Sequence, residues 1–264
     1  MIKIEKVKNR VTGKEIDFVL PDSIAVATIG MRNPKNSWNK TDSFYDEDGY
    51  ELGENDLKLA TTLAQAGPVH GKFVRQIYVC ADITAPLYWW KEFDTYKVGT
   101  VANSTSTMHK LTSRDITMDD LSCDKCLPEA IDILEATLVV CNSLRRKFVE
   151  LSEQKSPEAK SYWYSLIQTL PSSYNQTRTV TMNYEVLSGM YEYRKTHKLD
   201  EWKTFCSWIE TLPYAKELII RNGKSKQKEE EQKPKEIENK KVEQNTKLSK
   251  DLEIKRGHDR RLNF

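Results

Sequence analysis

The feature that most constrains the fold is a long helical repeat in the middle of the chain. Over residues 128–151, apolar side chains recur at steps of three and four for about six turns. This spacing places them on one face of an amphipathic helix. Similar spacing predicts further helices over residues 157–170, 177–195 and 202–209.

The first third of the chain has the shorter alternation typical of strands. Apolar residues alternate over 2–7 and cluster again over 16–20, with a turn at Thr12-Gly13 between them. Residues 23–31 are read as a third strand, and residues 31–55 as a turn-rich surface loop. Asn55 is expected to cap a helix over 57–64 that ends before Gly67-Pro68. Strands early and helices late predict an α+β fold.

The stretch between the two His residues at 70 and 109 is the most informative for function. A β-branched run leads to a turn at Ala85-Pro86, and an aromatic helix is expected over residues 87–97. Hydroxyl side chains then crowd residues 100–107. A polar run beside aromatics can form the wall of a small-molecule pocket, and a solvated loop with Ser/Thr turns is the alternative. The aromatic residues themselves are read as helix packing rather than as a stacking platform.

Charge divides the chain near residue 222. From residue 224 onward there are 13 Lys and Arg against 9 Asp and Glu, whereas the remainder has 28 against 30. We therefore predict an α+β domain over residues 1–221 and a disordered or solvated helical tail over 222–264. The nearly neutral domain argues against a broad nucleic-acid surface. The basic end of the tail leaves nucleic-acid or partner binding open there.

No stretch approaches the roughly 18 apolar residues that a membrane span needs, and the first residues lack the apolar core of a signal peptide. A cytoplasmic protein is expected. The five cysteines show no disulfide framework. Cys123 and Cys126 form a CxxC pair without a second pair, so they are read as ordinary thiols and no metal site is predicted.

Compared residue by residue, the stretch around Ala85-Pro86 resembles the motif region of the flavin-dependent thymidylate synthases. That family shows a His, a strand, Ala-Pro and a helix ending in Arg-Gln-x-x-Arg-His-Arg, followed by two serines and an arginine. Without a gap, the equivalent positions are His70, Ala85-Pro86, Lys91-Glu92, Thr95-Tyr96-Lys97, Thr100, Thr105 and Thr107. A second stretch resembles the family's LP…T-x-N…L…R pattern, with Leu170-Pro171, Thr181, Asn183, Leu187 and Arg194.

The resemblance implies a small antiparallel sheet with a helical bundle and a homotetramer whose sites lie between subunits. It also implies methylation of dUMP to dTMP with reduced FAD, methylenetetrahydrofolate and NADPH. FAD would lie against His70, Thr95, Tyr96, Lys97 and Asn183. The nucleotide would lie against Glu92, Ser104, Thr105 and Arg194. No side chain is expected to act as a catalyst itself, because flavin carries the chemistry while the protein binds and polarises.

Several departures from the family pattern leave the activity open. Arg-His-Arg is replaced by Thr95-Tyr96-Lys97, and the family glutamine is Glu92. Each charge-assisted hydrogen bond contributes about 1.5–3 kcal/mol, so the lost arginines need substitutes. Candidate substitutes are Lys91, Lys97, Arg75 and Arg178. The sequence therefore supports two hypotheses: an enzyme of this kind, and a non-catalytic nucleotide- or partner-binding protein that keeps the fold.

Overall fold

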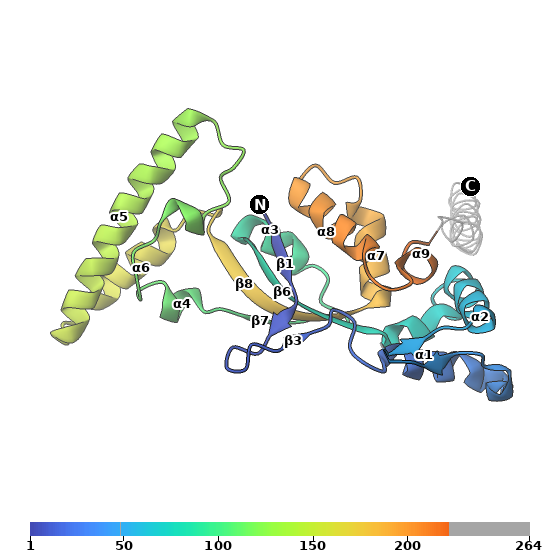
Figure 1. Cartoon of the computed structure of the whole chain (residues 1–264). Coiled ribbons are helices and arrows are strands. Elements are labelled where there is room, and N and C mark those ends of the chain that lie inside the picture. Colours follow the sequence, from blue (N-terminus) through green and yellow to red (C-terminus); the bar gives the residue numbers. More distant parts are fainter. Residues whose placement is uncertain (48, 222–264) are drawn as a thin grey trace, which may run out of the picture. The chain divides into compact units, whose positions relative to one another are not determined.

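A four-stranded antiparallel sheet organises the protein, with the strand order β1-β6-β8-β7 (Figure 1). The strands are β1 (Lys3–Glu5), β6 (Tyr78–Pro86), β8 (Asn175–Asn183) and β7 (Val101–Ser104). The computed structural model describes residues 1–47 and 49–221, and the compact unit spans Met1–Arg221. The predicted tail over 222–264 lies outside the described residues.

Helices surround this sheet, and two short ribbons extend from it. The helices are α1 (Ser23–Arg32), α2 (Glu54–Gln65), the 3-10 helix η3 (Gly71–Gln76), α3 (Leu87–Phe93), α4 (Thr107–Lys110), α5 (Pro128–Glu153), α6 (Ala159–Thr169), α7 (Tyr184–Arg194), α8 (Asp200–Glu210) and α9 (Ala215–Leu218). The ribbons pair β2 (Val7–Lys8) with β3 (Glu15–Ile16), and β4 (Phe44–Tyr45) with β5 (Tyr50–Glu51). The expected α+β architecture with a small antiparallel sheet is confirmed.

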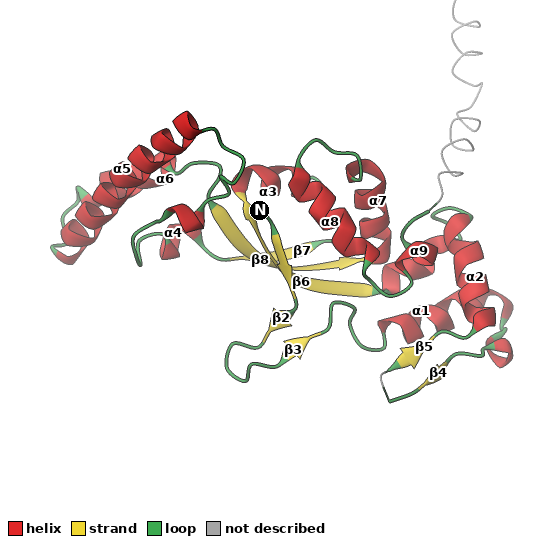
Figure 2. Ribbon diagram, turned by 45° about the horizontal axis from the view of Figure 1, so that its top comes forward, coloured by secondary structure: helices red, strands yellow, loops and turns green. Residues whose placement is uncertain are grey.

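One face of the sheet carries the main core. Strand β6 buries Val79, Ala81, Ile83 and Ala85, whereas the intervening residues point to the other face, as a two-residue period requires. Helices α3, α7 and α8 lie together on one side of the sheet (Figure 2). The aromatic residues of α3 pack into this core, where Trp89, Trp90 and Phe93 are at most 1% exposed. Their expected role in helix packing is confirmed.

The long helix expected over residues 128–151 is present as α5. It pairs with α6 around a second apolar cluster that includes Leu138, Cys141 and Leu166. Leu138 and Cys141 are three residues apart and face α6 together, which is the stripe that the sequence indicated. Helix α8 is also present where the Trp202 to Ile209 stripe predicts it.

A buried ion pair fixes the segment before α2. Arg32 donates through Nε to Oδ1 of Asp56 at 2.5 Å, and the two side chains are 5% and 0% exposed. The other oxygen of Asp56 accepts the hydroxyls of Thr41 and Ser43. The segment predicted to be a long surface loop therefore contains the β4–β5 ribbon and is anchored to α2, although most of its residues are exposed.

The prediction of a helix over 177–195 is wrong in its first half. Residues through Asn183 form β8, and α7 begins only at Tyr184. Val180, Asn183 and Leu187 fit helical steps of three and four, but Val180 and Met182 also alternate with threonines. All nine residues of β8 pair with β6, and this pairing selects the two-residue alternation of a strand over the helical spacing.

Three smaller predictions are also corrected. Residues 23–31 form helix α1 rather than a strand, because their buried residues Ile24, Ala27 and Met31 follow helical steps. Asn55 is not the cap of α2, which begins one residue earlier, and Asp42 from the preceding segment accepts its N–H. The aromatic helix ends at Phe93 instead of reaching residue 97.

The hydroxyl-rich segment after α3 is neither a simple loop nor a pocket wall along its whole length. Residues Val101–Ser104 form β7, an exposed edge strand paired with β8. Asn103 lies opposite Thr179, and Ser104 lies opposite Arg178. Its β-branched and hydroxyl side chains suit a half-solvated sheet edge.

Candidate functional site

Helices α3 and α7 meet through one ion pair between two residues predicted to bind substrate. Arg194, the last residue of α7, donates through Nη1 to Oε2 of Glu92 at 2.6 Å. Their side chains are 17% and 33% exposed, so the pair lies at the edge of the core. Residues 102 positions apart in the sequence are thus brought into direct contact at the C-terminal ends of two helices.

The oxygen Oε2 of Glu92 also contacts two further side chains. The indole Nε1 of Trp202 donates to it at 3.0 Å, and Nε2 of His197 lies 3.3 Å away. Nδ1 of His197 accepts the backbone N–H of Leu199, so in the neutral ring the hydrogen lies on Nε2, the nitrogen nearer to Glu92. Among the described residues, no donor binds the second oxygen, Oε1.

Aromatic rings hold the guanidinium of Arg194 in place. Its carbon Cζ lies 4.6 Å from the ring centroid of Trp202 and 5.4 Å from that of Tyr96, within the range of cation–π contacts. Its Nε also donates to the Tyr96 hydroxyl at 2.9 Å. Tyr96, predicted to bind the cofactor, therefore belongs to the same cluster as Glu92 and Arg194.

The turn between α3 and β7 touches the other end of α7. Gly99 has φ +78°, and a Cβ there would lie 3.1 Å from Nδ2 of Asn183 and 2.9 Å from Val186. Only glycine fits this close approach without strain. Since α7 has 11 residues, the contacts at its two ends lie roughly 16 Å apart.

Asn183 is not inside a helix as expected but caps the N-terminus of α7. Its Oδ1 accepts the N–H of Val186 at 3.0 Å, and the side chain is buried. The cap is what orients the amide toward Gly99. In the same turn, the Thr100 hydroxyl is buried and has no hydrogen-bond partner within the described part of the chain.

The remaining predicted residues are more scattered. Thr95 is exposed and donates its hydroxyl to the Glu92 carbonyl, and Lys97 is exposed in the same turn. Thr105 donates both its N–H and its hydroxyl to the Thr177 carbonyl, so pairing with the sheet already uses these groups. Ser104 is exposed at the end of β7.

His70 lies outside these contacts. It is exposed and stands at the N-terminus of η3, which packs against α1, α2 and α7. No hydrogen bond or ion pair joins it to the other predicted residues in the described structure. The other eight predicted residues lie along the α3–β7 connection and at the two ends of α7.

The candidate substitute cations differ in availability. Arg178 pairs with Asp94 at 2.7 Å, and its Cζ lies 4.2 Å from the Trp90 ring centroid, so it braces α3 against β8. Lys91 and Lys97 are exposed, and neither side-chain ammonium group forms an ion pair or hydrogen bond with another described residue. Arg75 is exposed on η3. The two lysines flank the Glu92 cluster along the chain.

Sequence reasoning missed His197 and Trp202 as members of this cluster. Trp202 was recognised only as one apolar position of α8, and it is indeed fully buried. Both residues lie after Arg194, beyond the last position of the motif. The helical spacing of apolar residues in α8 does not predict that the indole N–H of Trp202 donates to a carboxylate on another helix.

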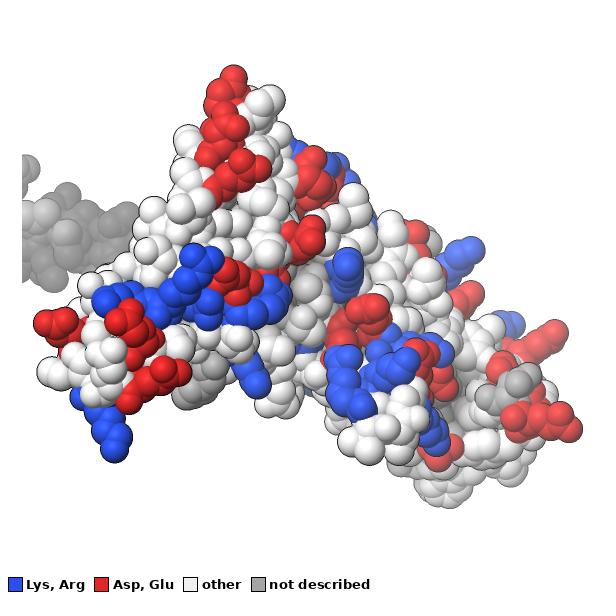
Figure 3. Space-filling view, turned by 60° about the vertical axis from the view of Figure 1, so that its left-hand side comes forward, with Lys and Arg blue, Asp and Glu red and all other residues white. Residues whose placement is uncertain are grey.

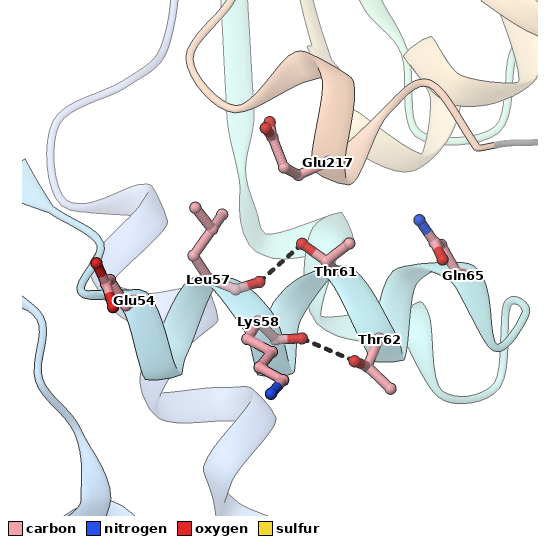
Figure 4. Close-up of a pocket in the computed structure, with 7 residues that line it drawn as sticks. All are labelled: Glu54, Leu57, Lys58, Thr61, Thr62, Gln65 and Glu217. Atoms are coloured by element: carbon pink, nitrogen blue, oxygen red, sulfur yellow. Dashed lines mark hydrogen bonds between the residues drawn. The ribbon is translucent and has the colours of Figure 1, made fainter.

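The described surface also has cavities away from the predicted site residues. One of about 410 Å³ lies between α2 and α9, where Glu217 faces Leu57 and Thr61 (Figure 4). The Thr61 and Thr62 hydroxyls there are already bound to backbone carbonyls of α2. This cavity holds none of the predicted site residues.

Surface charge does not form one extended basic patch on the face that includes α5. Lys and Arg are interspersed there with Asp and Glu (Figure 3). Asp115 pairs with Arg145 and Arg146, and Asp120 pairs with Arg114. In the described part of the chain, no helix is both long and apolar enough to cross a membrane.

Comparison with solved structures identifies the architecture. The thymidylate synthase X of Helicobacter pylori, crystallised with FAD and dUMP, superposes with a TM-score of 0.58, covering 83% of this chain and 98% of that chain at 15% identity. This chain has the fold of the flavin-dependent thymidylate synthases. A second structure of the H. pylori enzyme with FAD and dUMP gives a TM-score of 0.54 at 15% identity, with the same coverage of both chains.

A UMP/dUMP methylase, PolB of Streptomyces cacaoi, bound to 5-Br dUMP, is also similar. Its TM-score is 0.49 at 12% identity, covering 80% of this chain and 89% of that chain. No protein-family model matches the sequence, and no curated protein matches it.

Proposed function

We propose that this protein binds a pyrimidine deoxynucleotide and FAD along α7 and methylates the nucleotide reductively. The observation that carries the proposal is the Glu92–Arg194 contact. It joins two predicted substrate residues in a fold whose solved neighbours contain FAD and dUMP. Arg194 would bind the nucleotide through its remaining N–H groups, and Glu92 through its unoccupied oxygen. Ser104 would bind the nucleotide through its hydroxyl at the edge of the sheet, and Thr105 through the lone pairs of its hydroxyl oxygen, since its donors are bound to Thr177.

Residues at the N-terminal end of α7 and along the turn after α3 are suited to a flavin. The buried Thr100 hydroxyl has no partner in the described part of the chain, and the Asn183 amide nitrogen keeps its donors while Oδ1 caps the helix. Lys91 and Lys97 are exposed and can neutralise a pyrophosphate in place of the family's arginines. Thr95, Tyr96 and His70 would complete the contacts. When bound, reduced FAD supplies the hydride that completes the new methyl group.

Further partners follow from this activity. The one-carbon donor expected is methylenetetrahydrofolate, and the reductant is NADPH. The assembly expected is a homotetramer, in which a neighbouring copy would complete each site. The tasks left to this chain are to orient the pyrimidine ring against the flavin, exclude water and balance the phosphate charges.

A second candidate function is supported by the internal pairing of the site. Glu92 and Arg194 form an ion pair with each other, and the turn after α3 has one lysine, Lys97, where the family has two arginines. A protein with this cluster can bind a nucleotide without holding flavin. It would then be a non-catalytic nucleotide-binding protein with the same fold.

Absorption spectroscopy of the purified full-length protein separates the two functions. The enzyme should show flavin bands, as isolated or after addition of FAD, and dithionite should bleach them. Lys97→Ala should weaken FAD binding by at least about tenfold, as loss of one charge-assisted contact implies. Lys35→Ala, which removes an exposed lysine at the end of the 3-10 helix η1 (Asn33–Lys35), is the matched control. No flavin binding combined with a nucleotide-induced rise in melting temperature would instead establish the binding protein.

A further inference from the structure

A cavity beside the turn that joins α5 to α6 has a positive and partly apolar lining. Its volume is about 750 Å³, within the range of small-molecule sites. The C-terminal end of α5, the start of α6 and helix α4 all contribute to its walls, and none of the predicted site residues does. Among the described residues that line it there are two lysines and no Asp or Glu. The cavity therefore favours an anionic ligand.

Apolar side chains from three helices form one part of the lining. Phe148 lies on α5, Trp163 on α6 and Met108 on α4, and Met108 is 55% exposed. The indole Nε1 of Trp163 donates to the Met108 carbonyl at 3.4 Å, which joins α6 to α4. Aromatic rings pack well against other rings and against methionine sulfur. A flat aromatic group is therefore the apolar part of a ligand that this lining fits.

The positive charge of the cavity comes from Lys155, in the turn after α5, and Lys160, in the first turn of α6. Neither ammonium group forms an ion pair or hydrogen bond within the described part of the chain, and Nζ of Lys160 lies 5.9 Å from the ring centroid of Tyr164. A phosphate monoester carries a charge of about −1.5 to −2 near neutral pH. Lysines bind phosphate as point charges, so these two match its charge.

The backbone at Lys155 gives a second indication that this lysine serves a ligand. Lys155 has φ +54° and directly follows Gln154, the C-cap of α5. Its N–H donates to the Ser152 carbonyl, and the N–H of Ser156 donates to the Leu151 carbonyl at 2.9 Å. Glycine is usual at this position of a helix end, because a Cβ is strained there. Nζ of Lys155 does not bond to the end of α5 within the described residues, so local contacts do not explain the lysine.

We propose that this cavity binds a small molecule that contains an aromatic ring and a phosphate monoester group. Trp163 and Phe148 pack against the ring, and Lys155 and Lys160 bind the phosphate. The inference is independent of the proposed function, because the cavity includes none of the residues assigned to the nucleotide or to the flavin.

Phenyl phosphate is the simplest probe, since it consists only of the ring and the phosphate. Two-dimensional NMR of the full-length protein labelled with ¹⁵N at its tryptophans follows the binding, and Trp163→Phe identifies the Trp163 indole signal. Phenyl phosphate should shift that signal and leave the signal of Trp38, which is exposed on another part of the chain, unchanged. Phenol, which lacks the charge, should bind at least about tenfold more weakly, as loss of one charge-assisted contact implies.

Lys155→Gly separates a role in binding from a role in the fold. It should weaken phenyl phosphate binding at least about tenfold, and its melting temperature should equal or exceed that of the wild type, because glycine relieves the positive φ. Asn36→Gly, at another residue with positive φ, should keep the wild-type affinity. Lys147→Ala, which removes a cation of α5 paired with Glu150, should keep it as well.

Each other outcome contradicts part of the inference. A Trp163 signal that stays in place at millimolar phenyl phosphate would overturn it, and this measurement needs only the wild-type titration once the signal is assigned. Equal binding of phenol would show that the lysines do not recognise the phosphate. Wild-type affinity in Lys155→Gly would remove this lysine from the site. Binding of FAD and dUMP is measured separately, so the proposed function stands or falls on its own.

Discussion

Replacing Arg194 with methionine tests the contact that joins α3 to α7. Methionine keeps most of the aliphatic stem but removes the 2.6 Å bond to Glu92, the 2.9 Å bond to Tyr96 and the stacking on Trp202. A bond between charged groups contributes about 1.5–3 kcal/mol, and the other two contacts about 1 kcal/mol each. Glu92 is one-third exposed and keeps the Trp202 indole as a donor, so solvent screening reduces the sum. We expect a loss of about 2 kcal/mol in the free energy of unfolding.

Urea unfolding of the full-length protein, followed by circular dichroism, measures this loss. A double-mutant cycle with Glu92→Gln should give a coupling energy of about 1 kcal/mol, since the two side chains touch. Arg146→Met, which breaks an exposed pair with Asp115, should change stability by less than about 0.5 kcal/mol. An Arg194→Met protein as stable as the wild type, with no coupling to position 92, would show that the contact does not hold the two helices together in solution.

Three other substitutions test neighbouring parts of the account. Gly99→Ala should destabilise by about 1–2 kcal/mol in urea unfolding, because its Cβ would meet Val186 at 2.9 Å and φ is positive; a neutral result would refute the close approach of the turn to α7. Thr100→Val should leave stability unchanged or slightly higher, since it removes a buried hydroxyl without a partner in the described residues, yet weaken FAD binding in a fluorescence titration; a loss above about 1 kcal/mol would contradict this. Asp56→Asn should lower the free energy of unfolding by about 3–5 kcal/mol, because it leaves Arg32 buried without its counter-charge. A loss of only about 1 kcal/mol would disprove that role. Burial raises the pKa of Asp56, but hydrogen bonds from two hydroxyls and Arg32 outweigh this effect and lower the pKa below 3.8. The stabilisation from the ionised carboxylate should therefore be present above pH 3.8 and be lost at more acidic pH. Melting temperatures measured across this pH range test the loss.

The sequence predicted the parts of the fold in which the apolar residues follow only one spacing, that of a helix or that of a strand. Helix α5 could be anticipated because its stripe continues for more than six turns, and the strand before Ala85-Pro86 because β-branched residues fill it. Strand β8 could not, since Val180, Asn183 and Leu187 satisfy a helical spacing equally well. Only pairing with β6, nearly one hundred residues away, distinguishes the two possibilities.

The candidate site was anticipated in part, through the positions of the motif. Glu92, Tyr96 and Arg194 were placed in one site by their resemblance to family positions, and the structure brings them into contact. The resemblance could not predict that Glu92 would bind Arg194 itself, because the family has an uncharged glutamine there. His197 and Trp202 lie beyond the motif, and their roles depend on how α8 and the turn before it pack against α3.

The indole N–H of Trp202 offers the most direct test of the central claim. Two-dimensional NMR of protein labelled with ¹⁵N at its six tryptophans resolves each indole signal, and Trp202→Phe identifies the one bound to Glu92. Adding a pyrimidine deoxynucleotide should shift the Trp202 signal and leave that of Trp38, which is 48% exposed and bonded to Asn33, unchanged. A Trp202 signal that stays in place at saturating nucleotide would contradict a nucleotide site at the Glu92–Arg194 pair.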